Sequence, residues 1–332
     1  MNLLMYINPY TGQSFFGFFR ELLIRLYAFI TGKLPINALV SDEIQIIVLM
    51  CVAASAALVG TFLVLRKMTM LANSLSHTIL LGIVVAFVLT QDTFLNTDGH
   101  YHSINIQVML IASLVVGVLT AFLTEFLTKT ARLQEDASTG IVFTSLFALG
   151  IVLITLLTRN AHVGTEVVMG NVDALHLEDC KLVLIILGFN IFLCSIFFKE
   201  YKITTFDPAL ARSLGISTLF FNYLLMVQTS ATTIGAFRAV GVLMVLAFII
   251  GPVLTARLLV HQLKTLLWLA VGLGCLASLL GVAISRHFLS VYGIALSTSG
   301  IVVCVIVAQF LLAVLYRVYS FYGRWWKKAP LS

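Results

Sequence analysis

The sequence predicts an all-α integral membrane protein, a polytopic helical bundle of about nine transmembrane helices, with eight to ten as the range. Of its 332 residues, 60% are hydrophobic and only 10% are charged, whereas an ordinary soluble domain is about 25% charged. The mean hydropathy of +1.06 exceeds what a soluble fold can hide, because its own surface must face water. The strands of a β-barrel alternate polar and apolar residues and would be less hydrophobic. The composition therefore excludes a soluble enzyme, a nucleic-acid binder and a disordered scaffold.

Apolar runs of roughly 20 residues, the length that crosses a hydrocarbon core, divide the chain into expected spans. We expect residues 1–43 to form an N-terminal extension, 44–318 the transmembrane domain and 319–332 a basic cytoplasmic tail. Segment 14–32 has its charges on one side of a helix and Phe and Leu on the other, which indicates either an amphipathic interfacial helix or an extra membrane helix. The nine expected spans are 44–65, 74–90, 106–128, 139–158, 180–198, 218–236, 238–260, 265–285 and 299–317.

The basic residues of the loops orient the chain in the membrane. If the loop containing Arg66 and Lys67 is cytoplasmic, 13 of the 20 basic residues fall on that side and four on the other. Cytoplasmic loops carry such an excess of Lys and Arg, so we expect a multi-pass protein of the bacterial cytoplasmic (inner) membrane with a cytoplasmic C-terminus. The chain has no GxxxxGK[ST] motif, so any ATP hydrolysis is expected in a separate polypeptide.

A short segment of one cytoplasmic loop carries strong helix signals at both of its ends. Asp207 is a good N-cap, Pro208 suits the first helical position and Gly215 suits the C-terminal stop. These signals predict a helix of about two turns between two spans. Such a rigid knob can dock into another protein, or it can be a capped surface turn with no partner.

Asn73 and His77 are candidates for an intramembrane site. The two residues are four apart near the start of a span, so their side chains project from one helical face. An ionisable residue inside a membrane segment is a functional-site hypothesis by default, and imidazole is the commonest transition-metal ligand. The alternative is a structural histidine bonded to a neighbouring helix.

Two further features carry weaker hypotheses. Pro252, preceded by Gly251, frees a backbone carbonyl inside a span and predicts a kink, which can line a pathway or serve only packing. His100 and His102 lie with two aspartates in an expected outer loop. They could collect a divalent cation, although they have no defined ligand spacing and also fit a solvated loop.

Together, these segments resemble the membrane-spanning permease subunits of bacterial ABC importers for manganese, zinc or iron, the ABC-3 metal permease family. The resemblance extends from about residue 44 to 317. Each motif alone is weakly specific, but together, in this order and at these places in the topology, they are strongly specific. The matching stretches are Gly60 through Arg66-Lys67 to Asn73 and Ser76-His77; Glu135 to Ile141; Met169-Gly170-Asn171; Asp207-Pro208, Ala211 and Gly215; and Val240-Gly241, Leu243, Pro252 and Ala256-Arg257-Leu258-Leu259.

The resemblance implies a type II-like ABC importer permease that moves a divalent transition metal (Mn, Zn or Fe). The ion is cargo, and no cofactor is bound covalently. The implied partners are a cytoplasmic ATP-binding subunit, an extracytoplasmic metal-binding lipoprotein and a second permease subunit, in a homodimer or a heterodimer; nucleic acid is not among them. The resemblance assigns the metal pathway to Asn73 and His77, and the coupling helix that seats in the ATPase to Asp207, Pro208, Ala211, Arg212 and Gly215.

The chain departs from the family pattern at Asn73, where the family usually has Asp. Asparagine keeps a carbonyl oxygen but loses the charge, so a tight divalent site becomes less favourable. Either a partner permease supplies the acid or the metal is held more weakly.

Two alternative functions stay open at this point. A permease for a larger metal chelate, such as a siderophore or cobalamin, would need a wider pathway with fewer ligands. An ion-gradient-driven secondary transporter would more often show buried acids at mid-membrane and inverted repeats. Glu125 is the only acid deep in an expected span, and no convincing repeat is present. An intramembrane enzyme is disfavoured because the chain has no HExxH motif and no nucleophile–base constellation.

Overall fold

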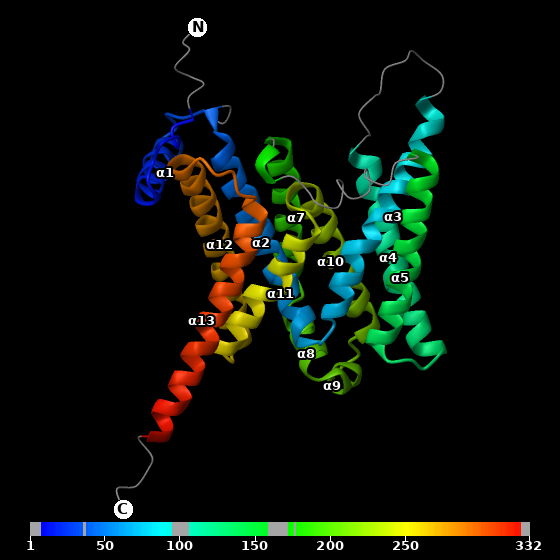
Figure 1. The fold of residues 1–332 in the computed structure, drawn as a ribbon. Helices are drawn as coiled ribbons and strands as arrows, with labels where there is room; N and C mark the ends of the chain where they lie inside the picture. Colours follow the sequence, from blue (N-terminus) through cyan, green and yellow to red (C-terminus); the bar gives the residue numbers. More distant parts are fainter. Residues whose placement is uncertain (1–7, 36–37, 95–105, 159–171, 176, 327–332) are drawn as a thin grey trace, which may run out of the picture.

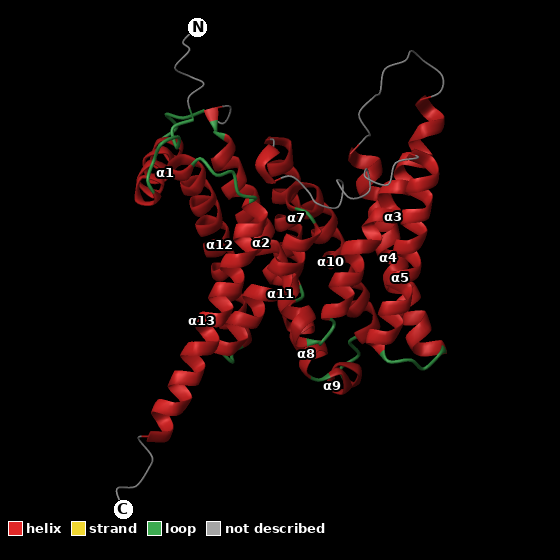
Figure 2. Cartoon of the chain, viewed as in Figure 1, coloured by secondary structure: helices red, strands yellow, loops and turns green. Residues whose placement is uncertain are grey.

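The computed structural model describes residues 8–35, 38–94, 106–158, 172–175 and 177–326. Within these ranges the chain is helical with connecting loops and contains no strand (Figure 2). The predicted all-α architecture is confirmed.

The helices run back and forth along one common direction (Figure 1). A π-helical turn, η4, continues α12, and a short 3-10 helix, η3, precedes α7. The elements are α1 (Phe15–Ile30), α2 (Ser41–Leu65), α3 (Thr69–Phe94), α4 (Ile106–Thr130), α5 (Glu135–Thr158), η3 (Val172–Ala174), α7 (Leu177–Ile196), α8 (Phe198–Phe206), α9 (Pro208–Ser213), α10 (Thr218–Val240), α11 (Val242–Leu259), α12 (Leu263–His287), η4 (Phe288–Tyr292) and α13 (Thr298–Trp326).

Eight helices in the described part of the chain are long and apolar enough to cross a membrane: α2, α3, α4, α5, α7, α11, α12 and α13. The expected span 218–236 is also helical, as α10, but it is not apolar enough to be counted among the eight. The polar residues in its middle are buried inside the bundle, namely Gln228, Thr229, Ser230, Thr232 and Thr233. Threonine hydroxyls donate to backbone carbonyls one turn earlier, for example Thr229 Oγ1 to the Leu225 oxygen at 2.7 Å. A helix covered by α2, α3, α4 and α7 need not be apolar.

The bundle is organised around α2, which packs against α7, α10, α11 and α12, while α3, α4 and α5 form a second group (Figure 1). Glycines allow the closest approaches between helices. A Cβ at Gly60 would lie 2.2 Å from the carbonyl oxygen of Ile249, and a Cβ at Gly82 would lie 2.4 Å from the Cα of Ser113. These positions bring α2 against α11 and α3 against α4.

The N-terminal extension forms a short helix, α1, at the end of the bundle opposite α9 (Figure 1). Its 16 residues span about 24 Å at 1.5 Å per residue, and it is not among the eight candidate spans. Phe18 is buried against the bundle, whereas Phe16, Tyr27 and Ile30 are exposed. Exposed apolar residues on a short helix that packs against α12 are typical of an interfacial helix.

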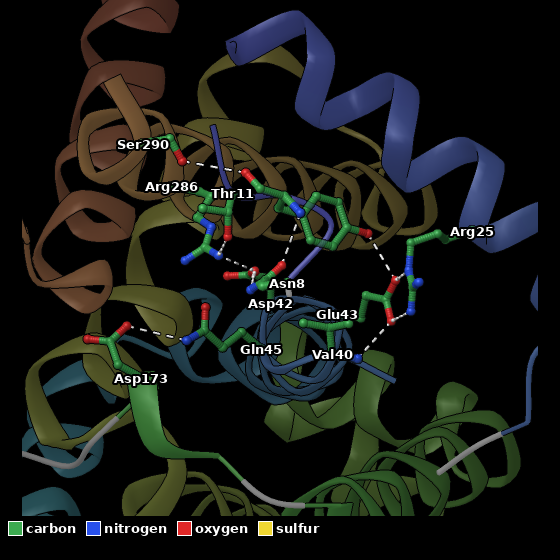
Figure 3. Close-up of polar contacts among 11 residues, drawn as sticks. Asn8, Thr11, Arg25, Val40, Asp42, Glu43, Gln45, Asp173, Arg286 and Ser290 are labelled. Atoms are coloured by element: carbon green, nitrogen blue, oxygen red, sulfur yellow. Dashed lines mark hydrogen bonds and ion pairs between the residues drawn. The ribbon is translucent and has the colours of Figure 1, made fainter. Parts of the chain in front are cut away.

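Polar contacts hold this extension to the first turn of α2 (Figure 3). Glu43 accepts hydrogen bonds from the hydroxyl of Tyr10 at 2.9 Å and from Nη2 of Arg25 at 3.2 Å. Burial and the neighbouring Glu43 raise the pKa of Tyr10, so its phenol stays protonated and donates. Asn8 Nδ2 also donates to Asp42 Oδ2 at 2.6 Å. Neighbouring contacts join the same region to α12 and η4: Arg286 Nη2 to Asp42 Oδ2 (3.4 Å) and to Thr11 Oγ1 (3.4 Å), and Ser290 Oγ to the Tyr10 oxygen (3.5 Å).

Candidate functional site

The short helix predicted in the loop before α10 is confirmed as α9. One carboxylate oxygen of Asp207 accepts hydrogen bonds from the backbone N–H groups of Ala209 at 3.1 Å and Leu210 at 2.9 Å. Pro208 occupies the first helical position, where its missing N–H costs nothing. Gly215 ends the helix with φ +76°, a left-handed conformation that favours glycine.

The faces of α9 differ sharply in burial. Ala211 is fully buried against the rest of the chain. Three large apolar residues are exposed here: Phe206, the last residue of α8, Leu210 of α9, and Leu214, which directly follows α9; the two leucines have exposed fractions of 47% and 58%. We call these three residues the α9 stripe. Sequence reasoning identified the capping residues and missed the stripe, although the four-residue spacing of Leu210 and Leu214 places them on one face of a helix and was a usable signal.

Arg212 completes the sequence-predicted set on α9. It is exposed in the last turn, and its Nε donates to the carbonyl oxygen of Pro208 at 3.3 Å. A cation in the last turn of a helix is favoured by the helix dipole.

A buried arginine ties the base of α9 to two long helices. Arg66, the residue that follows α2, donates from Nε to the hydroxyl of Thr205 at 2.9 Å and from Nη2 to that of Thr204 at 2.7 Å. Its Nη1 donates to Oδ1 of Asn222 on α10. Burial lowers the pKa of Arg66 to about 10, so the guanidinium remains charged at neutral pH. The contacts join the end of α2, α8 and the start of α10.

Tyr201, on the same face of α8 as Thr204 and Thr205, further fixes this helix on the bundle. Its ring is fully buried, with its centroid 5.0 Å from that of Phe62 on α2 and 5.6 Å from that of Phe221 on α10. Its hydroxyl donates to Oε1 of Gln228 at 2.5 Å. In this way α8, which directly precedes α9, is anchored to both α2 and α10.

Asn73 and His77 lie one turn apart on α3, and both are half-buried. The His77 ring lies against two aromatic rings of α5, with centroid distances of 5.2 Å to Phe143 and 5.5 Å to Phe147. These contacts place His77 on the α3 surface that faces α5, and Asn73 lies one turn away on the same helix. The helices α3 and α5 form the edge of the bundle away from α12 and α13 (Figure 1).

The described residues contain no group of three or more His, Cys, Asp or Glu side chains that could hold a metal ion. At the α3 position one chain offers an imidazole and an amide oxygen. The weak candidates His100 and His102 lie outside the residues that the structure describes, as does the Met169-Gly170-Asn171 turn.

Gly251 and Pro252 lie on α11, away from the α3–α5 pair. A Cβ at Gly251 would meet the Cγ2 atom of Ile306 on α13 at 2.2 Å, and Pro252 is buried. The structure thus assigns Gly251 a packing role between α11 and α13. A further role of these two residues in a pathway stays a prediction.

Glu125, the one acid expected deep in a span and therefore relevant to the secondary-transporter alternative, lies near the end of α4. It forms an ion pair with Lys129 at 2.6 Å, one turn further along the helix. Its position and its partner make it a helix-end ion pair and not an isolated mid-membrane carboxylate.

Comparison with known proteins identifies the family. The model of the ABC 3 transport family matches residues 43–317. The chain belongs to this family. It is therefore a membrane permease component of an ATP-binding-cassette transporter, as the sequence motifs predicted.

Relatives match over most of the chain. A protein from Chlamydia muridarum named "Probable metal transport system membrane protein" is 41% identical over 305 residues, covering 92% of this chain and 93% of the relative. The "Manganese transport system membrane protein MntD" of Bacillus subtilis is 38% identical, covering 69% of this chain and 78% of the relative. The solved structure "PsaBC from Streptococcus pneumoniae in complex with Fab" matches with a TM-score of 0.68 and 27% identity, covering 87% of this chain and 95% of that one.

Proposed function

We propose that this chain is the permease subunit of an importer that moves a divalent transition metal ion (Mn, Zn or Fe) across the bacterial cytoplasmic membrane. The observation that carries the proposal is the family match over nearly the whole membrane domain, together with relatives named for metal and manganese transport. ATP binding and hydrolysis belong to a separate cytoplasmic subunit, and the metal ion is the cargo.

The α9 helix is the coupling helix in this proposal. It lies at the same end of the bundle as the end of α13 (Figure 1), and the excess of basic residues supports a cytoplasmic location for that end. Its exposed α9 stripe offers an apolar surface to a groove of the ATP-binding subunit. Movement of that subunit would then pass through α8 and Arg66 to α2 and α10.

The metal path runs along α3, past Asn73 and His77. One imidazole and one amide oxygen are too few ligands for Mn, Zn or Fe, whose sites take four or more. A second permease subunit would supply the rest across α3 and α5. A homodimer would bring two such pairs together, whereas a heterodimer could restore the carboxylate that Asn73 lacks.

An extracytoplasmic metal-binding lipoprotein would deliver the ion at the opposite end of the bundle. The first turn of α2 and the N-terminal extension form part of that end (Figure 1). The ion pair between Arg25 and Glu43 and the contacts of Asp42 with Asn8 and Arg286 hold the N-terminal extension and α12 against the start of α2.

Reconstitution tests the proposal. The chain is co-purified with its ATP-binding subunit and partner permease and placed in vesicles, and radiolabelled manganese uptake is measured in the presence of the metal-binding lipoprotein. We expect uptake to require ATP and to persist when ionophores collapse the ion gradients. Uptake that follows the gradient without ATP would instead support a secondary transporter, and uptake of a siderophore or cobalamin in place of the free ion would support a chelate permease.

A further inference from the structure

An apolar cleft opens on the lipid-facing side of the bundle, between α7 and α12. Both helices pack against α2, and the cleft lies between them with α2 as its floor. Its volume is about 520 Å³, within the range of about 300–1,000 Å³ that is typical of small-ligand sites. Ala54 and Leu58 of α2 form part of its lining, and Leu187 and Ile191 of α7 face Leu267 of α12 across it.

A cation and two aromatic residues mark one end of this cleft. Lys264, in the first turn of α12, is the one charged residue in the lining, and its Nζ lies 6.0 Å from the ring centroid of Phe198. Trp268, one turn along α12, is 75% exposed. Tryptophan and lysine at the end of a membrane helix are typical of the boundary between hydrocarbon and headgroups. The cleft therefore runs from the level of the headgroups into the hydrocarbon.

We propose that this cleft binds a phospholipid with an anionic headgroup. An acyl chain lies between α7 and α12 over α2, and the phosphate pairs with the ammonium group of Lys264. The lining has no acidic residue, so nothing in it opposes a negative headgroup. A phospholipid supplies the apolar chain and the negative charge in one molecule.

The second permease subunit is a poorer occupant for this cleft. Its proposed contact lies along α3 and α5, and no residue of α3, α4 or α5 contributes to the cleft. The walls of the cleft also face the surrounding hydrocarbon, because Ile191 and Trp268 are exposed on their helices. Lipid is the medium that meets these residues.

Tryptophan quenching tests the site on the full chain. The sequence has three tryptophans, so W325F and W326F leave Trp268 as the single reporter. The protein is reconstituted in phosphatidylcholine vesicles that contain a minor fraction of either phosphatidylglycerol or phosphatidylcholine with brominated acyl chains. We expect brominated phosphatidylglycerol to occupy the site about fivefold more strongly, the preference that one basic residue near an anionic lipid gives, and to quench Trp268 correspondingly more.

Two pairs of variants separate the headgroup from the chain. K264Q should remove the preference for brominated phosphatidylglycerol, whereas R257Q, an exposed cation at the same end of the bundle but outside the cleft, should keep it. S195F, which fills the cleft from its exposed rim, should also remove the preference, whereas I185F, on the lipid-facing side of α7 outside the cleft, should not.

The outcomes are distinct. Equal quenching by the two brominated lipids in the chain with native Lys264 would mean that Trp268 meets only bulk lipid, and would overturn the proposal. A preference that persists in K264Q or in S195F would place the anionic lipid elsewhere and would overturn it as well. Metal uptake enters none of these readouts, so the result is independent of the proposed transport function.

Discussion

Truncating the two leucines of the α9 stripe should weaken the binding of the ATP-binding subunit without affecting the fold of the permease. Leu210 and Leu214 are 47% and 58% exposed, so about half of each side chain remains for a partner to cover. Full burial of a leucine contributes roughly 1.5–3 kcal/mol, and half of it contributes about 1 kcal/mol. The double variant L210A/L214A should therefore lose about 2 kcal/mol of binding free energy, or roughly 30-fold in affinity.

The assay is the dissociation constant of the ATP-binding subunit for the permease embedded in lipid nanodiscs. Leu184 of α7 and Leu311 of α13 are exposed to a similar extent on other helices, so L184A/L311A is the matched control and should bind as the native chain does. Asp207, whose side chain caps the start of α9, and Gly215, which holds the left-handed conformation after its end, are unchanged in both variants. An unchanged dissociation constant for L210A/L214A, in protein that inserts normally, would refute the coupling role of α9.

Three further predictions follow from contacts of the described residues. R66M removes the hydrogen bonds that join α2, α8 and α10, each worth about 1.5–3 kcal/mol for a charged donor. With this connection weakened, fewer manganese ions should be imported per ATP hydrolysed, and an unaltered ratio would contradict the proposed coupling. H77A should sharply reduce manganese uptake at near-normal protein abundance, because it removes the nitrogen ligand on that face; native uptake would argue against the site. G60V places a side chain where a Cβ alone would lie 2.2 Å from the Ile249 oxygen, and it should destabilise the chain by about 1–3 kcal/mol, visible as a lower midpoint of thermal unfolding.

Local chemistry made α9 predictable. Asp207, Pro208 and Gly215 act through their own backbone and the next few residues, so their pattern is sufficient to define where the helix begins and ends. The same holds for most spans, since crossing a hydrocarbon core demands a continuous apolar run. The α10 helix is the instructive exception. It is less apolar than the other spans because its neighbours cover it and shield it from the hydrocarbon. Its buried hydroxyls bond to backbone carbonyls of the same helix, so they are not left without partners.

Contacts between distant segments could not be predicted in this way. The Arg66 network depends on α8 and α10, which lie more than 130 residues further along the chain. The pairing of Arg286 with Asp42 joins α12 to the start of α2. Neither arginine has a neighbour in sequence that indicates its partner. The lipid-facing cleft likewise exists only because α7 and α12 flank α2.

The concentration dependence of ATP-driven manganese uptake by N73D tests the central claim most directly. If Asn73 lines the metal path beside His77, an aspartate adds a charged oxygen ligand to the ion. A gain of about 1.4 kcal/mol, modest for a new ion–carboxylate contact in a half-buried site, corresponds to a tenfold lower half-saturating manganese concentration. The maximal rate can move in either direction, because a tighter site releases its ion more slowly. We predict the lower half-saturating concentration, and an unchanged value would show that the metal does not pass this face of α3.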